Sequence, residues 1–145
     1  MERLVHRAYE IAKKELGIKE VPGSGDNPRI IEYLKAVDFN EETPLHDSIP
    51  HCSAFVNWCL QQAGGKGTRS PMARSFLGWG VETKTPVEGD IVVFKRGGSK
   101  SKGHVSFITE ILPLYIRCLG ANQSDAVCIQ QYNKTLVLGY RTSKY

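Results

Sequence analysis

The stretch IPHCSAFVNWCL, residues 49–60, is the most informative segment of the chain. A loop ends at Pro50, and the residues after it repeat at the spacing of one apolar helix face. That face is formed by Phe55, Val56, Cys59, Leu60 and Ala63. Cys52 lies on the same face, at the first turn, where unsatisfied N–H groups lower the pKa of a thiol and can hold a developing oxyanion. Cys52 is therefore a candidate nucleophile, with a small buried structural cysteine as the alternative.

The segments around this stretch predict helices before it and strands after it. Apolar residues at helical spacing predict a helix over residues 4–16 that stops at Gly17. Asn27 and Pro28 are typical of the N-cap and first residue of a second helix, and Ser70-Pro71 begins a short one. Short β-rich runs follow Pro86, at residues 91–94, 105–111, 114–119, 126–131 and 136–140. This order predicts one α+β domain over residues 1–145, with N-terminal helices packed on a C-terminal antiparallel sheet.

The composition is that of a globular chain, with 41% hydrophobic and 23% charged residues among 145. No apolar run is long enough to span a bilayer and no secretory signal is evident, so we expect a protein made in the cytoplasm without stable membrane insertion. Residues 1–50 carry ten acids and seven bases (−3), whereas residues 51–145 carry five acids and twelve bases (+7). A basic half attracts nucleic acid or an anionic cell envelope equally well.

The four cysteines are expected to be free thiols. Cys52 and Cys59 are seven residues apart on one helix, roughly 10 Å along its axis, which is beyond disulfide reach. Cys118 and Cys128 are equidistant from Gln123, so a symmetric hairpin would set them opposite each other, where a bridge is conceivable. We expect both to be reduced core thiols and Cys59 to be structural.

A thiol nucleophile needs a base, and His104 is the best candidate. It follows Gly103 and opens a predicted strand, where the sheet can orient the ring toward a cleft. A triad also needs a group that orients the imidazole. The turn GANQSD, residues 120–125, offers Asn122, Gln123 and Asp125, and the choice among them stays open. A surface histidine and an ordinary hairpin turn are the alternatives.

Other chemistries find little support in the sequence. The basic run at residues 95–102 lacks the interleaved aromatic residues of a nucleic-acid site, although it could draw an anionic substrate toward His104. The acidic loop at residues 38–47 does not match the twelve-residue calcium loop. No phosphate-binding glycine motif is present. We therefore expect no metal, no cofactor and no nucleic-acid partner.

Several of these segments together resemble the CHAP family of cysteine, histidine-dependent amidohydrolases and peptidases. The resemblance is carried by CSAFVNWC (52–59), GDIVVF (89–94), GHV (103–105) and GANQS (120–124). The segments AKKELG (12–17) and GDNPRI (25–30) are similar to the compact single-domain members found in phage and prophage lysis proteins. The resemblance to the CHAP family implies a papain-like α+β fold, with Cys52 as nucleophile, His104 as base and Asn122 as the third polar group. His51, Ser53 and Gln123 are then expected to contact substrate.

The sequence departs from the family pattern at two places. Many CHAP domains have a glutamate just before the third polar residue, where this chain has Gly120 and Ala121. The family usually has an aromatic residue before the cysteine, where this chain has His51. The first departure keeps Gln123 and Asp125 open beside Asn122.

The resemblance implies a phage-type endolysin: a monomer that cuts an amide bond in the peptide of bacterial peptidoglycan. An endopeptidase and an N-acetylmuramoyl-L-alanine amidase would use the same residues. Such a protein would be made in the host cytoplasm and would act on the wall after release through the membrane. A non-catalytic wall-binding or phage structural module and an interbacterial toxin with the same chemistry are the alternatives.

Overall fold

The computed structural model describes residues 2–22, 25–39, 42, 44–47, 50–123 and 125–145, with residues 122 and 123 described by their backbone alone. Its helices are α1 (Leu4–Lys13), α2 (Pro28–Leu34), α3 (Cys52–Gln62) and the short 3-10 helices η1 (Ala73–Gly78) and η2 (Lys134–Leu136). Its strands are β1 (Val81–Glu82), β2 (Ile91–Lys95), β3 (Gly103–Ile111), β4 (Tyr115–Gln123), β5 (Ala126–Asn133) and β6 (Val137–Thr142).

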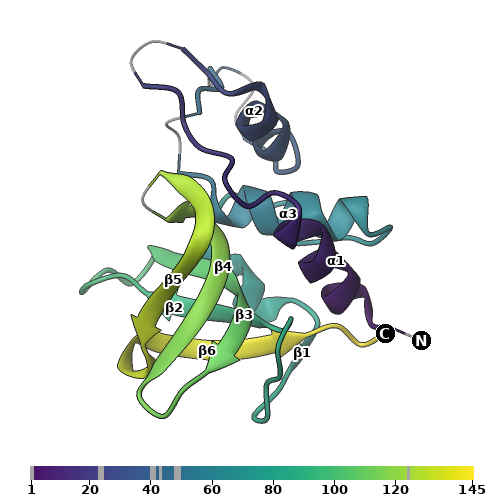
Figure 1. Cartoon of the computed structure of the whole chain (residues 1–145), viewed down its shortest axis with the longest axis vertical. Coiled ribbons are helices and arrows are strands. Elements are labelled where there is room, and N and C mark those ends of the chain that lie inside the picture. Colours follow the sequence, from purple (N-terminus) through teal and green to yellow (C-terminus); the bar gives the residue numbers. More distant parts are fainter. Residues whose placement is uncertain (1, 23–24, 40–41, 43, 48–49, 124) are drawn as a thin grey trace.

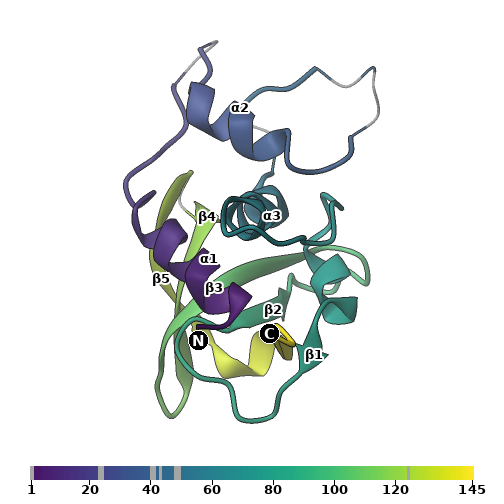
Figure 2. The same cartoon turned by 90° about the vertical axis from the view of Figure 1, so that its right-hand side faces the viewer.

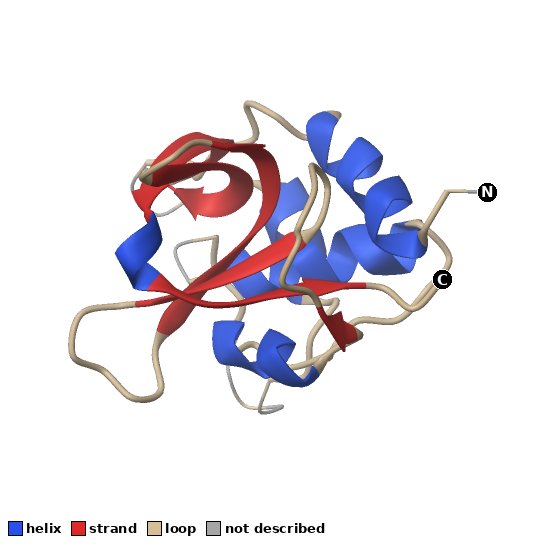
Figure 3. Cartoon of the chain, turned by 90° about the horizontal axis from the view of Figure 1, so that it is seen from below, coloured by secondary structure: helices blue, strands red, loops and turns tan. Residues whose placement is uncertain are grey.

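The strands form one antiparallel sheet in the order β1-β6-β2-β3-β4-β5. Helix α3 lies against one face of this sheet beside α1, and α2 lies on the side of α3 away from the strands (Figure 1, Figure 2). Seen from below, the strands curl strongly instead of forming a flat layer (Figure 3). The prediction of N-terminal helices packed on a C-terminal antiparallel sheet is therefore confirmed.

The sheet buries apolar side chains on both of its faces. On β2, Ile91 and Val93 belong to the core shared with the helices, whereas Val92 and Phe94 belong to a second cluster inside the curl. Because side chains alternate between the faces of a strand, a strand that is buried on both sides reads as a continuous apolar run. The unbroken sequence of β2 follows from this position.

The predicted start of the second helix is confirmed. The side chain of Asn27 accepts a hydrogen bond from the Arg29 N–H at 2.9 Å, and Pro28 is the first residue of α2. The predicted end of the first helix is wrong: α1 ends at Lys13, and a turn continues from there to Gly17, whose φ of 98° favours glycine. Within the described part of the chain, no helix is both long and apolar enough to cross a membrane.

Candidate active site

Helix α3 places Cys52 where three backbone N–H groups meet. Cys52 is the first residue of the helix, and its side chain is almost wholly buried. The N–H groups of Val105 and Ser53 donate hydrogen bonds to the sulfur, and the N–H group of Cys52 itself lies close to it. The Ser53 and Cys52 groups belong to the first turn of α3, as expected for a helix N-terminus. The Val105 group comes from β3, so the sulfur lies at the junction of helix and sheet.

The sheet opens at this junction, which explains why Val105 can donate to a thiol. The Ile108 N–H donates to the Asp90 carbonyl on the β2 side, and N–H groups alternate in direction along a strand. The Val105 N–H therefore points toward β4. The pairing of β3 with β4 reaches only as far as Phe107 and Leu119. Beyond that pair, the beginning of α3 supplies an acceptor for Val105 in the form of the Cys52 sulfur.

Burial raises the pKa of the Cys52 thiol above its ordinary value, because the charged form loses water. The Val105 N–H, the positive charge of Arg96 and the two N–H groups of α3 act in the opposite direction and are outweighed. The N–H groups of the helix N-terminus lower this pKa, as expected, but they do not bring it below the ordinary value of a thiol. The N-terminal effect is present, and desolvation exceeds it.

Strand β3 holds His104 next to this sulfur. His104 directly precedes Val105, so the residue that donates to Cys52 is bonded to the candidate base. The imidazole is 4% exposed and lies on the inner face of the curl. Its ring centroid lies 5.3 Å from that of Tyr132 and 6.4 Å from that of Phe94. The fold thus brings together Cys52 and His104, which are 52 residues apart in the sequence.

A serine that the sequence analysis did not single out orients the imidazole. Ser106 Oγ lies 2.8 Å from His104 Nε2, and the serine is fully buried. Residues i and i+2 on a strand share one face, so the spacing of His104 and Ser106 was a usable signal. With Nε2 engaged in this way, the other ring nitrogen, Nδ1, is the one that can serve a nucleophile.

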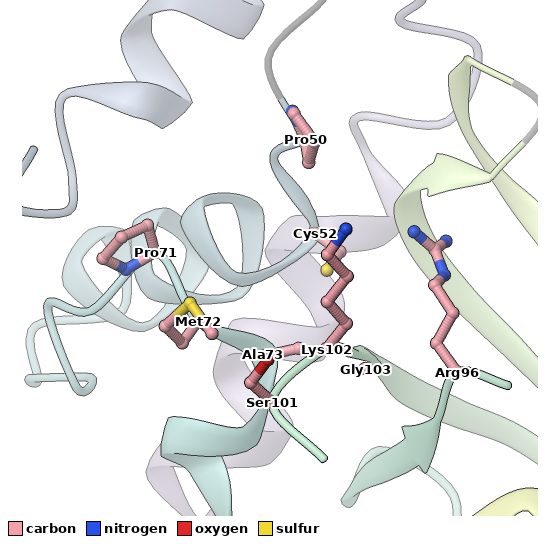
Figure 4. Close-up of a pocket in the computed structure, with 9 residues that line it drawn as sticks. All are labelled: Pro50, Cys52, Pro71, Met72, Ala73, Arg96, Ser101, Lys102 and Gly103. Carbon is pink, nitrogen blue, oxygen red and sulfur yellow. The ribbon is translucent and has the colours of Figure 1, made fainter. Parts of the chain in front are cut away.

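An open cavity of about 300 Å³ lies over the Cys52 sulfur (Figure 4). One wall comes from the segment before and within η1, and the opposite wall comes from the β2–β3 loop. Its lining residues are Pro50, Cys52, Pro71, Met72, Ala73, Arg96, Ser101, Lys102 and Gly103. A substrate that enters here would therefore meet the thiol between an apolar wall and a basic one.

The remaining predicted site residues lie elsewhere or outside the description. His51 is 1% exposed, and Ser53 is fully buried with its hydroxyl donating to the Ser70 carbonyl at 2.7 Å. Neither residue lines the cavity, and their contact with substrate stays a prediction. Both face the interior because they belong to the first turn of a helix that is buried on all sides. The side chains of Asn122 and Gln123 lie outside the described residues.

Asp125, the third alternative for the orienting group, faces a different neighbour. It is exposed and has a φ of 61°, as expected for a tight turn after β4. Its carboxyl hydrogen-bonds Glu20 and raises the pKa of that residue. The carboxyl of Asp125 is thus engaged with the segment after α1. Among the described residues, no three His, Cys, Asp or Glu side chains gather to form a metal site.

The four cysteines are free, as expected, and Cys118 and Cys128 do not lie opposite each other as a hairpin centred on Gln123 would place them. In the β4–β5 ladder, Cys118 is opposite Gln130 and Cys128 is opposite Gly120. The two cysteines are therefore diagonal neighbours. The hairpin is not centred on Gln123, because the pair next to its turn is Gln123 with Ala126, and a bulge between Gly120 and Gln123 changes the register by one residue. Cys59 and Cys118 are fully buried, and Cys128 is half-buried.

Solved structures with similar folds belong to the NlpC/P60 type. The P60 domain of a Mycobacterium avium subspecies paratuberculosis antigen aligns over 97% of this chain and 93% of its own, with 13% identity and a TM-score of 0.57. Mycobacterium tuberculosis RipD, described as a non-catalytic NlpC/p60 domain protein adapted to peptidoglycan binding, aligns over 100% of both chains, with 12% identity and a TM-score of 0.55. These likenesses confirm the expected papain-like α+β fold.

A third similar structure is an NLP/P60-family lipoprotein-like protein of Staphylococcus aureus. It is 16% identical, the alignment covers 98% of this chain and 42% of that one, and the TM-score is 0.54. None of the curated proteins matches the chain by sequence. The CHAP domain family matches residues 45–122, more than half of the chain and the part that carries Cys52 and His104. The chain therefore belongs to the CHAP domain family, whose members have functions of the peptidoglycan hydrolase type.

Proposed function

We propose that this protein is a cysteine-dependent peptidoglycan hydrolase of the phage endolysin kind, which cuts an amide bond in the wall peptide. One observation carries the proposal. The Cys52 sulfur lies at the floor of an open cavity and accepts a hydrogen bond from Val105, the residue bonded to His104. The nucleophile is thus at a surface that a polymer can reach, and the base is the buried residue directly before Val105 on β3. Family membership supports the same reaction class.

In the proposed reaction, His104 takes the thiol proton as the sulfur of Cys52 attacks the scissile carbonyl. The carbon–sulfur bond forms, and backbone N–H groups of the first turn of α3 stabilise the oxyanion. The imidazolium then gives its proton to the leaving amine as the carbon–nitrogen bond breaks. Water, deprotonated by His104, hydrolyses the thioester and restores the thiol. Because burial raises the pKa of Cys52, deprotonation accompanies attack instead of preceding it.

The third polar group of this reaction remains Asn122 in our proposal, with Gln123 and Asp125 as alternatives. Asn122 lies three residues after Leu119 on β4, the strand that neighbours β3, which carries His104. Ser106 lies within hydrogen-bond distance of the same imidazole. We assign Ser106 the role of a positioning residue for His104 whichever of the three completes the site.

The proposal is tested by comparing wild type with Cys52→Ala on purified peptidoglycan. Wild type should release soluble fragments, and Cys52→Ala should release none. Cys128→Ser is the matched control, since Cys128 is a half-buried cysteine that does not line the cavity. Full lytic activity of Cys52→Ala would refute the mechanism. Mass spectrometry of the fragments identifies the bond, because an amidase leaves a free lactyl end and an endopeptidase leaves a shortened stem on the glycan.

An endolysin role also places the site of action in the wall, after synthesis in the host cytoplasm and release through the membrane. Expression of the protein inside a bacterium should then leave the cells intact until the membrane is permeabilised. Lysis should follow permeabilisation for wild type and fail for Cys52→Ala. Lysis of intact cells without permeabilisation would contradict this part of the proposal.

A non-catalytic wall-binding module is the second candidate function. The almost complete burial of Cys52 and its raised pKa favour this alternative, since an unreactive thiol would have both properties. It predicts that wild type and Cys52→Ala bind purified peptidoglycan equally and that neither releases fragments. Fragment release by wild type excludes it.

A further inference from the structure

The β2–β3 loop gives the cavity a wall with a strong positive charge. Residues 95–102 contain four bases and no acid, and Arg96 and Lys102 are the two bases that line the cavity. None of the lining residues carries a negative charge. Among the described residues, neither Arg96 nor Lys102 takes part in an ion pair. The charge of this wall is therefore available to a ligand.

Both basic side chains are directed toward the nucleophile. Figure 4 shows Arg96 and Lys102 extending from the loop toward the start of α3, where the sulfur of Cys52 lies. The charge of Arg96 acts on the Cys52 thiol and on the hydroxyl of Tyr132, and lowers the pKa of each against the effect of burial. The guanidinium thus lies within electrostatic reach of the atom that attacks the substrate.

Arg74 fixes the loop that presents these charges. From η1, its Nε donates to the Lys102 carbonyl at 2.8 Å and its Nη2 donates to the Ser99 carbonyl at 2.6 Å. The Ser99 hydroxyl in turn accepts from the Lys102 N–H at 3.0 Å. At Gly103, where the loop ends, an added Cβ would lie 2.6 Å from the Phe94 carbonyl oxygen, so the close packing on β2 requires glycine. The planar fork of Arg74 therefore holds two points of the loop at once.

We propose that Arg96 and Lys102 bind a carboxylate that the substrate carries close to its scissile amide, and that Arg74 positions the loop for this contact. The inference rests on the proposed hydrolase function and adds a specificity to it. Guanidinium and ammonium groups recognise carboxylates through charge-assisted hydrogen bonds, which the neutral carboxamide makes less well. A carboxylate placed there would orient the neighbouring carbonyl over the Cys52 sulfur. Substrates in which this carboxylate is amidated would be hydrolysed with a lower kcat/KM.

The test uses two soluble peptides that contain the bond identified by mass spectrometry and differ in one group, a free carboxylate or a carboxamide beside that bond. Wild type should prefer the carboxylate peptide by roughly ten- to a hundredfold in kcat/KM. Arg96→Gln and Lys102→Gln should each reduce this ratio, and Arg96→Lys should restore part of it. The ratio is informative because an effect of Arg96 on thiol reactivity is common to both peptides and cancels.

Lys100→Gln is the matched control, because it removes the same charge from the same loop at an exposed residue that does not line the cavity. It should keep the wild-type ratio. Arg74→Gln should raise KM for the carboxylate peptide more than it lowers kcat, and Arg74→Lys should recover only part of the loss because an ammonium lacks the fork. If Arg74 had a purely structural role, Arg74→Gln would lower kcat/KM for both peptides equally. That result would contradict the positioning role.

Different experimental results would overturn the carboxylate site and the proposed hydrolase function. Equal hydrolysis of the two peptides by wild type, or an unchanged ratio in Arg96→Gln and Lys102→Gln, would overturn the carboxylate site while leaving the hydrolase in place. If wild type releases no fragments from purified peptidoglycan, the proposed function fails, and calorimetric binding of a wall peptide with a free carboxylate or with a carboxamide decides the inference. Tighter binding of the carboxylate peptide that Arg96→Gln abolishes would support it, and equal binding would overturn it.

Discussion

The acidity of the Cys52 thiol in the unliganded protein can be measured directly by alkylation. Only the thiolate reacts with iodoacetamide, so the rate follows the fraction that is ionised. Cys59 and Cys118 are fully buried, and burial raises the pKa of both. Cys128 is half-buried and is removed by Cys128→Ser. In this background, the alkylation rate reports on Cys52.

The expected profile follows from the direction of the pKa shift. The pKa of Cys52 lies above its ordinary value of 9.0, because burial outweighs the N–H groups and the charge of Arg96. At pH 7 no more than about 1% of the thiol is then ionised. The rate should rise about tenfold for each pH unit between about pH 6 and 8, without a plateau below about pH 9. Arg96→Gln should move the profile to still higher pH, because it removes one of the groups that lower the pKa.

The assay is mass spectrometry of the peptide that contains Cys52 after timed alkylation at each pH. Cys52→Ala in the same background gives the contribution of the other thiols. A plateau between about pH 5 and 7 would mean that a thiolate and an imidazolium already exist as a pair. That outcome would refute the conclusion that desolvation dominates at this sulfur. It would also refute proton transfer in step with attack.

Three further predictions follow from described contacts. Ser106→Ala should lower kcat on purified peptidoglycan about five- to tenfold, because it removes the hydroxyl that contacts His104 Nε2, and an unchanged kcat would contradict the positioning role. Asn57→Ala should lower the free energy of unfolding by about 2 kcal/mol and Tm by about 6 °C in thermal unfolding, because the Arg69 N–H loses its buried acceptor at 2.7 Å. Burial raises the pKa of Tyr9, Tyr33 and Tyr132, so the folded protein keeps protons that the unfolded chain loses. In urea unfolding, the stability from these groups should be complete below about pH 9 and should decrease as the pH rises past about 10, whereas a constant stability up to pH ~11 would be inconsistent with the shifts.

The parts of the fold that the sequence predicts are those that depend on local patterning. The amphipathic repeat of α1, the Asn27 cap of α2 and the unbroken apolar run of β2 each reflect a single element and its burial. The same logic predicts Cys52 at the start of α3 and His104 at the start of β3. These two residues could be paired only through the resemblance to a family, because their separation in sequence contains no information on their distance in space.

The features that the sequence could not predict depend on register and on contacts between distant segments. The bulge between Gly120 and Gln123 changes which residues face each other on β4 and β5. The residues of the turn do not predict this bulge. The amphipathic repeat of α1 assigns no partner to His6. In the structure, its Nε2 lies 3.0 Å from an Oδ1 of the buried Asp90, because α1 packs next to the turn that leads into β2.

The residues that hold the two cavity walls in place differ from the charged residues that face the cavity. Ser53 and Asn57, two buried polar residues of α3, hold the Ser70 carbonyl and the Arg69 N–H, and so fix the segment that becomes the apolar wall. Arg74 fixes the opposite wall through two loop carbonyls. All four hydrogen bonds end on backbone atoms, so they constrain the course of the chain without specifying the side chains that face the cavity. Exposed side chains such as Arg96 and Lys102 can therefore be replaced with little cost in stability. It follows that substrate specificity can change on this fold while the Cys52 and His104 geometry stays the same.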